Sequence, residues 1–152
     1  MHIRRAGHAD AAEIRELVRS AYAKWIAVIG REPVPMGADY DRAVRENAID
    51  LLFVGDRLVA LIETVHAVDH LMIENVAVLP GLQGRGYGRV LLEHAERLAA
   101  SLGLPELKLY TNKRFAANIE IYRRLGYAIY REEPFKGGFL VHMSKRVATP
   151  DQ

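Results

Sequence analysis

The sequence predicts an α/β (α+β) fold in which a mixed central sheet of roughly six to seven strands is flanked by about four helices. Apolar segments of strand length alternate along the chain with segments whose apolar residues recur at helical spacing. The stretch 76–92 joins a buried strand to a helix through a glycine-spaced loop, as in α/β proteins that bind phosphates. Of the 152 residues, 50% are apolar, which is enough for one core. We expect one domain over residues 1–147 and a loose tail over 148–152.

The N-terminal half is predicted to hold a first strand, two helices and a hairpin. Asp10 and Glu13 have the spacing of a capping box, and apolar residues continue from there at helical spacing. Pro33, Pro35 and Gly37 interrupt that pattern. The elements expected here are a strand at His2–Arg5, a helix from Asp10 to Trp25, a loop at Arg31–Gly37, a helix near Asp39–Ala48, and hairpin strands at Asp50–Val54 and Leu58–His66.

The C-terminal half alternates strands and helices before a final strand pair. The helix after the glycine loop has a buried stripe through Leu91, Ala95, Leu98 and Leu102. The elements expected here are a strand at His70–Leu79, the helix just named, a strand at Leu107–Thr111, a helix at Phe115–Leu125, and strands at Ala128–Glu133 and Phe139–Lys145 around a loop at Pro134–Gly138.

The loop before the first of these helices is a predicted anion site. The first turn of a helix leaves backbone N–H groups without partners, and the aligned peptide dipoles place partial positive charge there. Glycines at 84, 86 and 88 leave these groups open to a ligand, and Arg85 and Arg89 add positive charge. We therefore expect a cofactor with a pyrophosphate. A glycine-rich turn that only caps an ordinary helix is the alternative.

The spacing of the glycines distinguishes between cofactors. A dinucleotide fingerprint needs a glycine where Arg89 stands, and a Walker loop needs a lysine where Tyr87 stands. The pattern Gln83-x-x-Gly86-x-Gly88 instead resembles the pyrophosphate loop of the GNAT superfamily of acyl-CoA-dependent N-acetyltransferases. This resemblance implies acetyl-CoA as co-substrate, and no metal is expected.

A second segment strengthens the resemblance. Residues 118–127 are similar to the C-terminal signature of the same superfamily, a helix that carries a tyrosine and ends at Leu-Gly-Tyr. Gly126 suits the left-handed position after a helix, and Arg123 and Arg124 suit the dipole of its last turn. The two segments follow the family's order with a strand between them. The resemblance covers roughly 70–127 and, with the flanking strands, most of the chain, so it implies a GNAT-like fold.

The resemblance also implies how the donor is held. The backbone of Val76 and Val78 would pair with the pantetheine arm like another strand, and the Val76 N–H would point at the acyl oxygen. Asn118 would take over a cofactor hydrogen bond that many family members give to an asparagine where Phe115 stands. The residues expected to bind the cofactor are Val76, Val78, Gln83, Gly84, Arg85, Gly86, Gly88, Arg89 and Asn118.

Tyr122 is the candidate general acid. The resemblance matches it to the tyrosine of the signature helix. A phenol that titrates at about pH 10 is protonated at neutral pH and is a plausible donor to a departing CoA thiolate. An aromatic side chain that merely packs on an amphipathic helix is the alternative.

Glu74 is the candidate general base. An ammonium group must lose a proton before it attacks, either to a carboxylate with a water or through desolvation. Glu74 lies in an otherwise apolar strand and matches a glutamate that some family members use, and strand alternation puts it on one face with Val76 and Val78. Glu63 is the runner-up, and Tyr110 could relay a proton. Solvated or arginine-paired carboxylates are the alternative for both acids.

The first helix–loop–helix region is where relatives build the acceptor pocket, although core packing explains its aromatic residues equally well. Arg31 is the better indication, because a cation in the proline-rich loop would select an acceptor with a carboxylate or phosphate. The candidate substrate residues are Tyr22, Trp25, Arg31 and Tyr40.

Two histidine patterns carry little weight. His66-x-x-Asp69-His70 has ligand-type residues, but it spans a predicted turn and lacks a fourth ligand. His94 lies on the exposed side of a predicted helix, where we expect it to be solvated.

Composition excludes several classes of function. Without cysteine the chain forms no disulfide, thiolate metal site or cysteinyl intermediate. A net charge of +2, with 21 basic and 19 acidic residues interspersed, predicts no nucleic-acid surface. No apolar run reaches membrane-span length and no signal-peptide core follows the start, so we expect a cytoplasmic protein. Whether it forms a homodimer is left open.

With the resemblance, these features imply an enzyme. It is expected to be an N-acetyltransferase that moves an acetyl group from acetyl-CoA to a primary amine by direct attack in a ternary complex. A small-molecule acceptor is favoured, because the segment 25–40 is long enough to close a pocket. Two alternatives stay open, an N-acetyltransferase of protein N-termini or lysines and a non-catalytic acyl-CoA-binding module.

Overall fold

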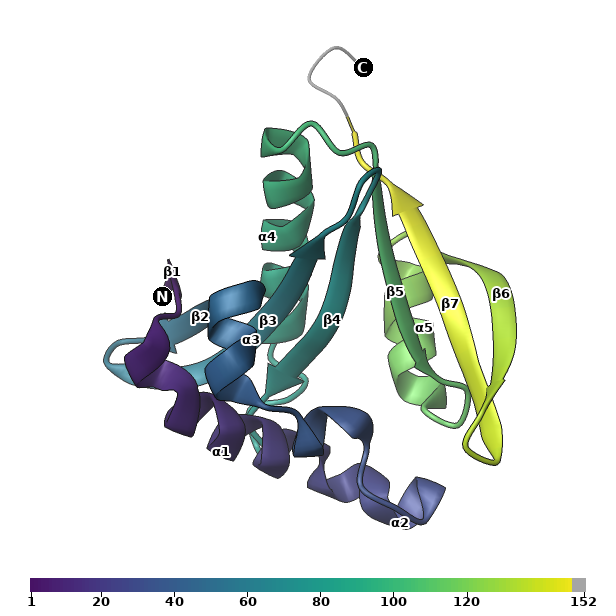
Figure 1. The fold of residues 1–152 in the computed structure, drawn as a ribbon, viewed down its shortest axis with the longest axis horizontal. Helices are drawn as coiled ribbons and strands as arrows, with labels where there is room; N and C mark the ends of the chain where they lie inside the picture. Colours follow the sequence, from purple (N-terminus) through teal and green to yellow (C-terminus); the bar gives the residue numbers. More distant parts are fainter. Residues whose placement is uncertain (149–152) are drawn as a thin grey trace.

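A mixed sheet of seven strands forms the centre of the molecule, in the order β1-β2-β3-β4-β5-β7-β6 (Figure 1). The structure is a computed structural model that describes residues 1–148, so most of the expected tail, residues 149–152, lies outside the described residues. The strands are β1 (His2–Arg5), β2 (Ala48–Val54), β3 (Arg57–His66), β4 (Leu71–Val78), β5 (Glu106–Asn112), β6 (Ala128–Phe135) and β7 (Gly138–Arg146). The helices are α1 (Ala11–Tyr22), α2 (Ile26–Ile29), α3 (Tyr40–Glu46), α4 (Tyr87–Ser101) and α5 (Ala116–Arg124), with 3-10 turns at His8–Asp10, Ala23–Trp25 and Val34–Gly37. The predicted fold class is confirmed.

The sheet opens between its two parallel strands. β4 and β5 pair along 71–73 and 107–109, and beyond these residues the two strands diverge (Figure 1). All other neighbouring strands of the described sheet pair in antiparallel fashion. Parallel strands bring their carboxyl ends to one edge of a sheet, which is where open α/β sheets bind ligands. The divergence therefore leaves a gap at the edge where a ligand site is expected.

An extra residue in β4 lies where that strand leaves β5. Glu63 of β3 faces Asn75, whereas Thr64 faces Ile73, so Glu74 bulges out of the ladder. A bulge bends its strand and increases the local twist. The bulge at Glu74 thus accounts for the divergence of β4 from β5.

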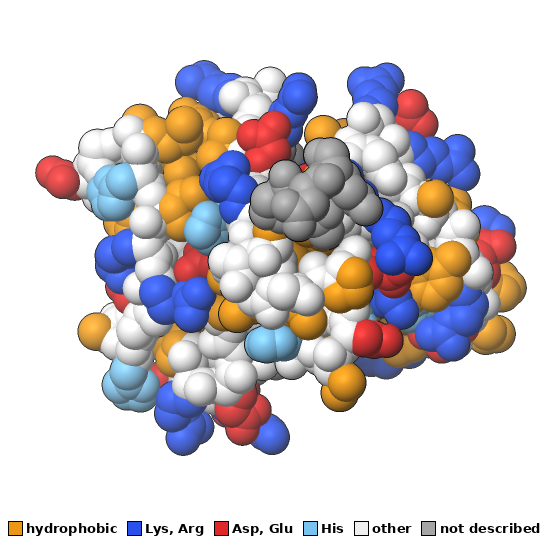
Figure 2. Space-filling view, turned by 90° about the horizontal axis from the view of Figure 1, so that it is seen from above, with side chains coloured by type: hydrophobic (Ala, Val, Ile, Leu, Met, Phe, Trp, Pro, Cys, Tyr) orange, Lys and Arg blue, Asp and Glu red, His pale blue; other side chains and the backbone are white. Residues whose placement is uncertain are grey.

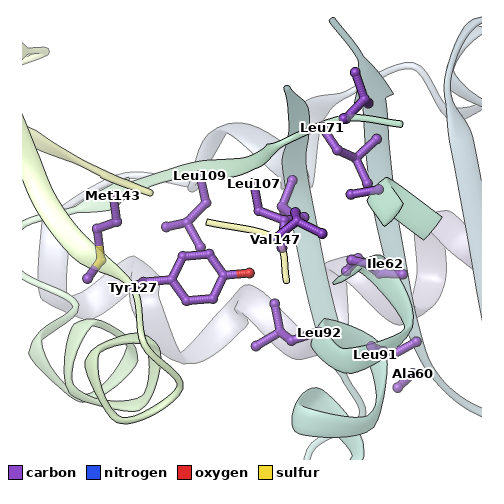
Figure 3. Packing of buried hydrophobic residues seen from close by; sticks show 14 of the residues in the cluster. Ala60, Ile62, Leu71, Leu91, Leu92, Leu107, Leu109, Tyr127, Met143 and Val147 are labelled. Atoms are coloured by element: carbon purple, nitrogen blue, oxygen red, sulfur yellow. The ribbon is translucent and has the colours of Figure 1, made fainter. Parts of the chain in front are cut away.

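Helices cover both faces of the sheet, and each face has its own buried cluster. On one face α4 packs Leu91 and its neighbours against β3, β4, β5 and β7, with Tyr127 in the same cluster (Figure 3). On the other face α1 and α3 pack Ile14 and Tyr40 against β2 and β3. Burial of one Leu or Ile side chain contributes about 1.5–3 kcal/mol. These contacts fix the helices, and with them the loops around the gap.

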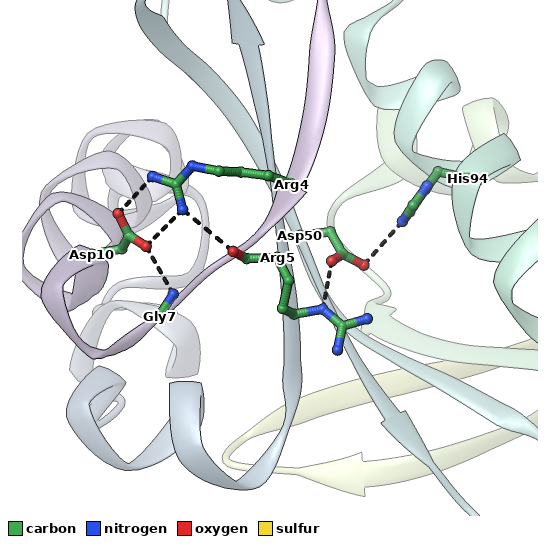
Figure 4. Close-up of polar contacts among 6 residues, drawn as sticks. All are labelled: Arg4, Arg5, Gly7, Asp10, Asp50 and His94. Atoms are coloured by element: carbon green, nitrogen blue, oxygen red, sulfur yellow. Dashed lines mark hydrogen bonds and ion pairs between the residues drawn. The ribbon is translucent and has the colours of Figure 1, made fainter.

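Two local predictions are wrong. Asp10 does not cap α1, because its carboxylate accepts hydrogen bonds from Arg4 at 2.9 Å and from the Gly7 N–H at 2.8 Å (Figure 4). The loop expected at Pro134–Gly138 is shorter, since β6 runs on to Phe135. β6 is an edge strand, and an edge tolerates a proline that lacks an N–H donor.

His94 is also not solvated as expected. Its Nε2 lies 2.9 Å from Oδ2 of Asp50, and Arg5 Nε donates to Oδ1 of Asp50 at 2.6 Å (Figure 4). Burial alone would raise the pKa of Asp50, but hydrogen bonds from His94 and Arg5 together lower it. The polar cluster ties β1, β2 and α4 together, and a sequence pattern for the helix alone could not reveal it.

The surface shows mixed charge. On the face drawn in Figure 2, Lys and Arg side chains are interspersed with acidic ones rather than gathered in one patch. Within residues 1–148, none of the helices has the length and apolar character needed to cross a membrane.

Candidate active site

The loop between β4 and α4 presents backbone donors to the gap. Gly86 precedes the helix with a φ of +86°, a left-handed conformation that glycine adopts at no steric cost. The first backbone hydrogen bond of α4 runs from the Val90 N–H to the Gly86 carbonyl oxygen at 3.0 Å. The N–H groups of residues 87–89 therefore have no partner within the helix and are available to an anion.

Gln83 joins this loop to β4. Its Nε2 donates to the Val78 carbonyl oxygen at 3.1 Å, and Lys24 Nζ donates to its Oε1 at 2.5 Å. These bonds hold the start of the loop against the end of β4 and bring a lysine from the 3-10 turn after α1 beside it. A Cβ atom at Gly88 would make an ordinary contact 4.0 Å from Val78 Cγ2, so the fold itself does not demand a glycine there.

A groove of about 370 Å³ runs along this loop. It brings together β4, the glycine loop, α5 and the end of α1, which come from distant parts of the chain. Arg85 is exposed and does not line it. The predicted cofactor residues that line it are Val76, Val78, Gln83, Gly84, Gly86, Gly88, Arg89 and Asn118.

A second cavity of about 430 Å³ adjoins the groove and lies among β4, β5, the 31–38 loop and the β6–β7 hairpin. Side chains from all of these segments line it. Four residues line both spaces, namely Tyr22, Val76, Asn118 and Tyr122. We call the first space the donor groove and the second the acceptor cavity. Their common boundary lies at the middle of the gap.

Tyr122 lies at that boundary. It projects from α5, half-buried, with its ring edge-on to Tyr127 at a centroid distance of 5.9 Å. Burial raises the pKa of Tyr122 to about 12, because the phenolate would lose solvation. The hydroxyl therefore stays protonated and can act as a proton donor toward both spaces.

Two carboxylates line the acceptor cavity beside the boundary. Tyr110 donates to Oε2 of Glu74 at 3.0 Å, and burial together with this carboxylate raises the pKa of Tyr110 to about 12. Glu63 is 8% exposed and accepts a hydrogen bond from Asn47 at 2.8 Å. Burial, with the charge of Glu74 added to it, raises the pKa of Glu63. Two carboxylates from neighbouring strands therefore lie within one cavity.

Strand alternation does not describe the faces of β4 correctly. The bulge at Glu74 interrupts the alternation of side chains between the two faces of the sheet. As a result, Val76 and Val78 pack against the same cluster as Leu71 and Ile73. Glu74 lines the acceptor cavity and Val78 lines the donor groove. Val76 lines both spaces, so Glu74 shares the acceptor cavity with Val76 but not with Val78.

Asn75 organises a polar network that sequence reasoning missed. The Tyr22 hydroxyl donates to Oδ1 of Asn75 at 2.7 Å and lies 3.3 Å from the Val76 carbonyl oxygen. Asn75 Nδ2 donates to the Tyr40 hydroxyl at 3.3 Å, which in turn donates to the Pro35 carbonyl oxygen at 2.6 Å. The network links β4 to α1, α3 and the proline-rich loop. A polar amide in an apolar strand was the signal that could have found it.

The four candidate substrate residues take different positions. Tyr22 and Tyr40 reach the acceptor cavity, although Tyr40 is fully buried. Trp25 instead stacks on Phe115 with ring centroids 4.2 Å apart and lines the donor groove. Arg31 lies over the Phe135 ring, 5.6 Å from its centroid, at the acceptor cavity. This contact joins the 31–38 loop to the end of β6.

Glu133 and His142 also line the acceptor cavity and were not expected there. Nε2 of His142 lies 2.7 Å from Oε1 of Glu133, and the His142 ring lies 5.8 Å from that of Tyr110. A histidine in the apolar run 139–143 was the available signal. Within the described residues, no three His, Asp or Glu side chains gather as a metal site would require.

Comparison with known proteins agrees with this geometry. The profile of the acetyltransferase (GNAT) family matches residues 12–127. Among solved structures, the Paia N-acetyltransferase from Thermoplasma acidophilum, in complex with coenzyme A, superposes with a TM-score of 0.75 at 17% identity, over 95% of this chain and 98% of that chain. At that identity the likeness shows a shared fold.

Curated relatives match over the central part of the chain. Streptothricin acetyltransferase of Streptomyces lavendulae is 36% identical over 81 residues, which are 49% of this chain and 43% of that protein. The ribosomal protein bS18-alanine N-acetyltransferase of Salmonella typhimurium is 37% identical over 76 residues, 50% of this chain and 51% of that protein. The match thus spans about half or less of the length of these relatives.

Proposed function

The chain belongs to the acetyltransferase (GNAT) family, and from this premise we propose that it transfers an acetyl group from acetyl-CoA to a primary amine of a small molecule. The observation that carries the proposal is the shared boundary of the two spaces. A groove with free backbone donors and a cavity with carboxylates meet at Tyr122 and Val76. Direct transfer requires such a meeting, because donor and acceptor must be in contact.

The donor groove supplies the groups that acetyl-CoA needs. The open N–H groups of residues 87–89 would bind the pyrophosphate, with Arg89 beside it. The backbone of Val76 and Val78 would pair with the pantetheine arm, since β4 has left β5 at this point. Asn118 at the boundary would donate to the cofactor. The solved relative with bound coenzyme A supports this donor.

Residues at and beside the boundary would carry out the proton transfers. The neutral amine attacks the thioester carbonyl carbon, so that a C–N bond forms, the C–S bond breaks and its electron pair stays on sulfur. The Val76 N–H would stabilise the oxyanion. Glu74, through a water, would take the amine proton, with Glu63 as the second candidate. Tyr122 would give its proton to the thiolate.

The shape of the acceptor cavity favours a small molecule. Arg31 on one side and Phe135 on the other meet across it at 5.6 Å, and a volume of about 430 Å³ is typical of small-ligand sites. The relative named for streptothricin is consistent with this choice. The relative named for a ribosomal-protein alanine instead favours an enzyme of protein N-termini, which is the second candidate.

Thermal unfolding with ligands tests the donor first. A ligand that binds only the folded state raises the melting temperature. At a concentration about 100 times its Kd, acetyl-CoA or CoA is expected to raise the midpoint by roughly 5–10 °C, and NAD and ATP are expected to raise it much less. An equal shift with NAD, or none with CoA, would contradict the proposal.

Release of the CoA thiol tests the transfer. The measurement compares a panel of small amines with peptides that carry a free N-terminus or a lysine. Faster turnover with small amines supports the proposal, and turnover confined to peptides supports the second candidate. Tight binding of acetyl-CoA without turnover of any amine would identify a non-catalytic acyl-CoA-binding module instead.

A further inference from the structure

The acceptor cavity carries more negative charge than the reaction of one amine requires. Carboxylates of Glu63, Glu74 and Glu133 line it, and Arg31 is the single Lys or Arg side chain among its described lining residues. That guanidinium is already engaged, since it lies over Phe135 and donates to a carbonyl oxygen of its own loop. The excess of carboxylates points to a cationic ligand.

Two of the carboxylates lie together at the reacting end. Glu74 is the bulged residue of β4, and Glu63 of β3 pairs in the ladder with Asn75, the residue next to it. Glu74 keeps Oε1 free of hydrogen bonds within the described residues, because Tyr110 bonds to Oε2. We assign both of these acids to the amine that reacts.

The third carboxylate belongs to a different wall. Glu133 lies in β6, which is separated from β5 by β7, so its backbone is two strand spacings, about 10 Å, from β5. His142 holds the carboxylate at 2.7 Å, and the His142 ring lies between those of Tyr110 and Tyr130, with centroids 5.8 Å and 6.0 Å away. Glu133 is therefore preorganised away from the reacting end.

One carboxylate oxygen of Glu133 is without a partner within residues 1–148. Its contacts with His142 at 2.7 Å and with Arg131 at 4.0 Å both involve Oε1. Within residues 1–148, Oε2 has no hydrogen-bond or ion-pair partner. Leu140 and Phe135 line the same cavity and offer an apolar surface to an alkyl stem.

We propose that the acceptor is a small amine with a second cationic group, such as a linear diamine, and that Glu133 binds this second group while the first amine reacts beside Glu74. The inference rests on the proposed function. An ammonium at Glu133 would gain a charge-assisted hydrogen bond in a partly enclosed site, and its alkyl stem would cover Leu140. If Arg31 rather than Glu133 decided specificity, the preferred acceptor would carry a carboxylate instead of a second cation.

Matched substrates of equal length test the proposal. Rates of CoA release are compared for diaminohexane, hexylamine and aminohexanoate, which end in a cation, a methyl group and a carboxylate. The wild-type protein is expected to favour diaminohexane over hexylamine by roughly 10- to 100-fold in kcat/KM. Glu133→Gln is expected to remove this preference by lowering kcat/KM for diaminohexane.

Two further variants test whether the effect depends on the charge at position 133. Glu132→Gln alters the neighbouring carboxylate, which pairs with Lys113 outside the cavity, and is expected to keep the full preference for the diamine. Glu133→Lys is expected to shift the preference to aminohexanoate. An unchanged rise of the melting temperature with acetyl-CoA establishes that each variant is folded.

This assay distinguishes a failure of the diamine inference from a failure of the proposed function. Equal rates with hexylamine and diaminohexane, or a wild-type preference for aminohexanoate, would overturn the diamine inference while acetyl transfer stands. An unchanged preference in Glu133→Gln would overturn the role of Glu133. No turnover of any amine, with acetyl-CoA still bound, would overturn the proposed function itself.

Discussion

The donor groove and the acceptor cavity adjoin each other but are built from different chemical groups. The donor groove relies mainly on backbone: the open N–H groups at the start of α4 and the unpaired edge of β4. The acceptor cavity relies on side chains, the carboxylates and phenols of β3, β4, β5 and β6. Backbone groups are the same in every sequence, so the groove depends on conformation, whereas the cavity depends on residue identity. Substitutions should therefore affect the two spaces in different ways.

The largest effect is expected where the two spaces meet. Tyr122→Phe keeps the ring against Tyr127 and removes the proton donor, so kcat should fall about 100-fold or more while the Kd of acetyl-CoA stays nearly constant. Initial rates and calorimetric binding measure the two quantities. The matched control is Tyr127→Phe, because the buried Tyr127 hydroxyl has no hydrogen-bond partner within residues 1–148. Equal losses in the two variants would show that the Tyr122 hydroxyl has no special role as a proton donor.

The pH profile gives a separate test of Tyr122. Its acid form is the active one, and burial raises the pKa of Tyr122 to about 12. A raised pKa keeps the proton on the hydroxyl, so ionisation of Tyr122 should not reduce kcat between about pH 8 and pH 10. A fall of kcat in this range that Tyr122→Phe abolishes would contradict the assignment.

A smaller effect, confined to the acceptor side, is expected at Asn75. Asn75→Ala leaves the hydroxyls of Tyr22 and Tyr40 without their partner, which should cost about 1–3 kcal/mol of unfolding free energy. We expect kcat to fall roughly 10-fold with little change in the Kd of acetyl-CoA, because Asn75 does not line the donor groove. Denaturant unfolding and steady-state rates measure both. Thr64→Val is the control, since the buried Thr64 hydroxyl has no partner within the described residues and its loss should not destabilise the fold.

A substitution at Gly86 is expected to affect the donor side rather than the acceptor side. Gly86→Ala forces a side chain into a left-handed conformation and should disturb the first turn of α4. The Kd of acetyl-CoA should rise about 10-fold, and kcat at saturation should change little. Gly55→Ala places the same change in the β2–β3 hairpin, at a φ of +60°, away from both spaces. A similar rise of the Kd in Gly55→Ala would mean that backbone strain, rather than the loop, weakens binding.

The same contrast explains how much the sequence could predict. The order of strands and helices and the donor loop were predictable, because apolar periodicity and the run Gln83–Gly88 are local patterns. The resemblance to the family predicted that Val76 and Tyr122 belong to one site, and the structure brings both to the boundary of the two spaces. The element order and the donor loop are thus encoded largely by residues that are close together in the sequence.

The acceptor cavity was not predictable in the same way. Glu133 and His142 line the same cavity as Glu74 only because of the order of β5, β7 and β6, and no spacing along the chain reveals that order. The bulge at Glu74 reverses the face of the following side chains, which an alternating pattern cannot show. His94 is a further case, because its partner Asp50 lies in β2. Side-chain sites between distant elements need the packed structure.

The smallest effect is expected outside both spaces, at Asp10. Its hydrogen bond from Arg4 is the main cause that lowers the pKa of Asp10 from 3.8 to about 2. A carboxyl pKa that is lower in the folded state stabilises the protein above the unfolded value, and this contribution is lost as the pH falls from about 5 to below the folded-state pKa of about 2. Arg4 is 46% exposed, so solvent screening reduces the contribution to about 1 kcal/mol.

Asp10→Asn should therefore lower the melting temperature by roughly 2–4 °C at neutral pH, and the difference from wild type should shrink below about pH 4 and vanish only below about pH 2. Neither kcat nor the Kd of acetyl-CoA should change, because Asp10 lines neither space. Glu46→Gln removes an exposed ion pair with Arg42 and should shift the melting temperature by less than the Asp10 change does. A loss of acetyl-CoA affinity in Asp10→Asn would show that the donor groove responds to the stability of the whole fold. In that case the separation of backbone and side-chain functions between the two spaces would no longer hold.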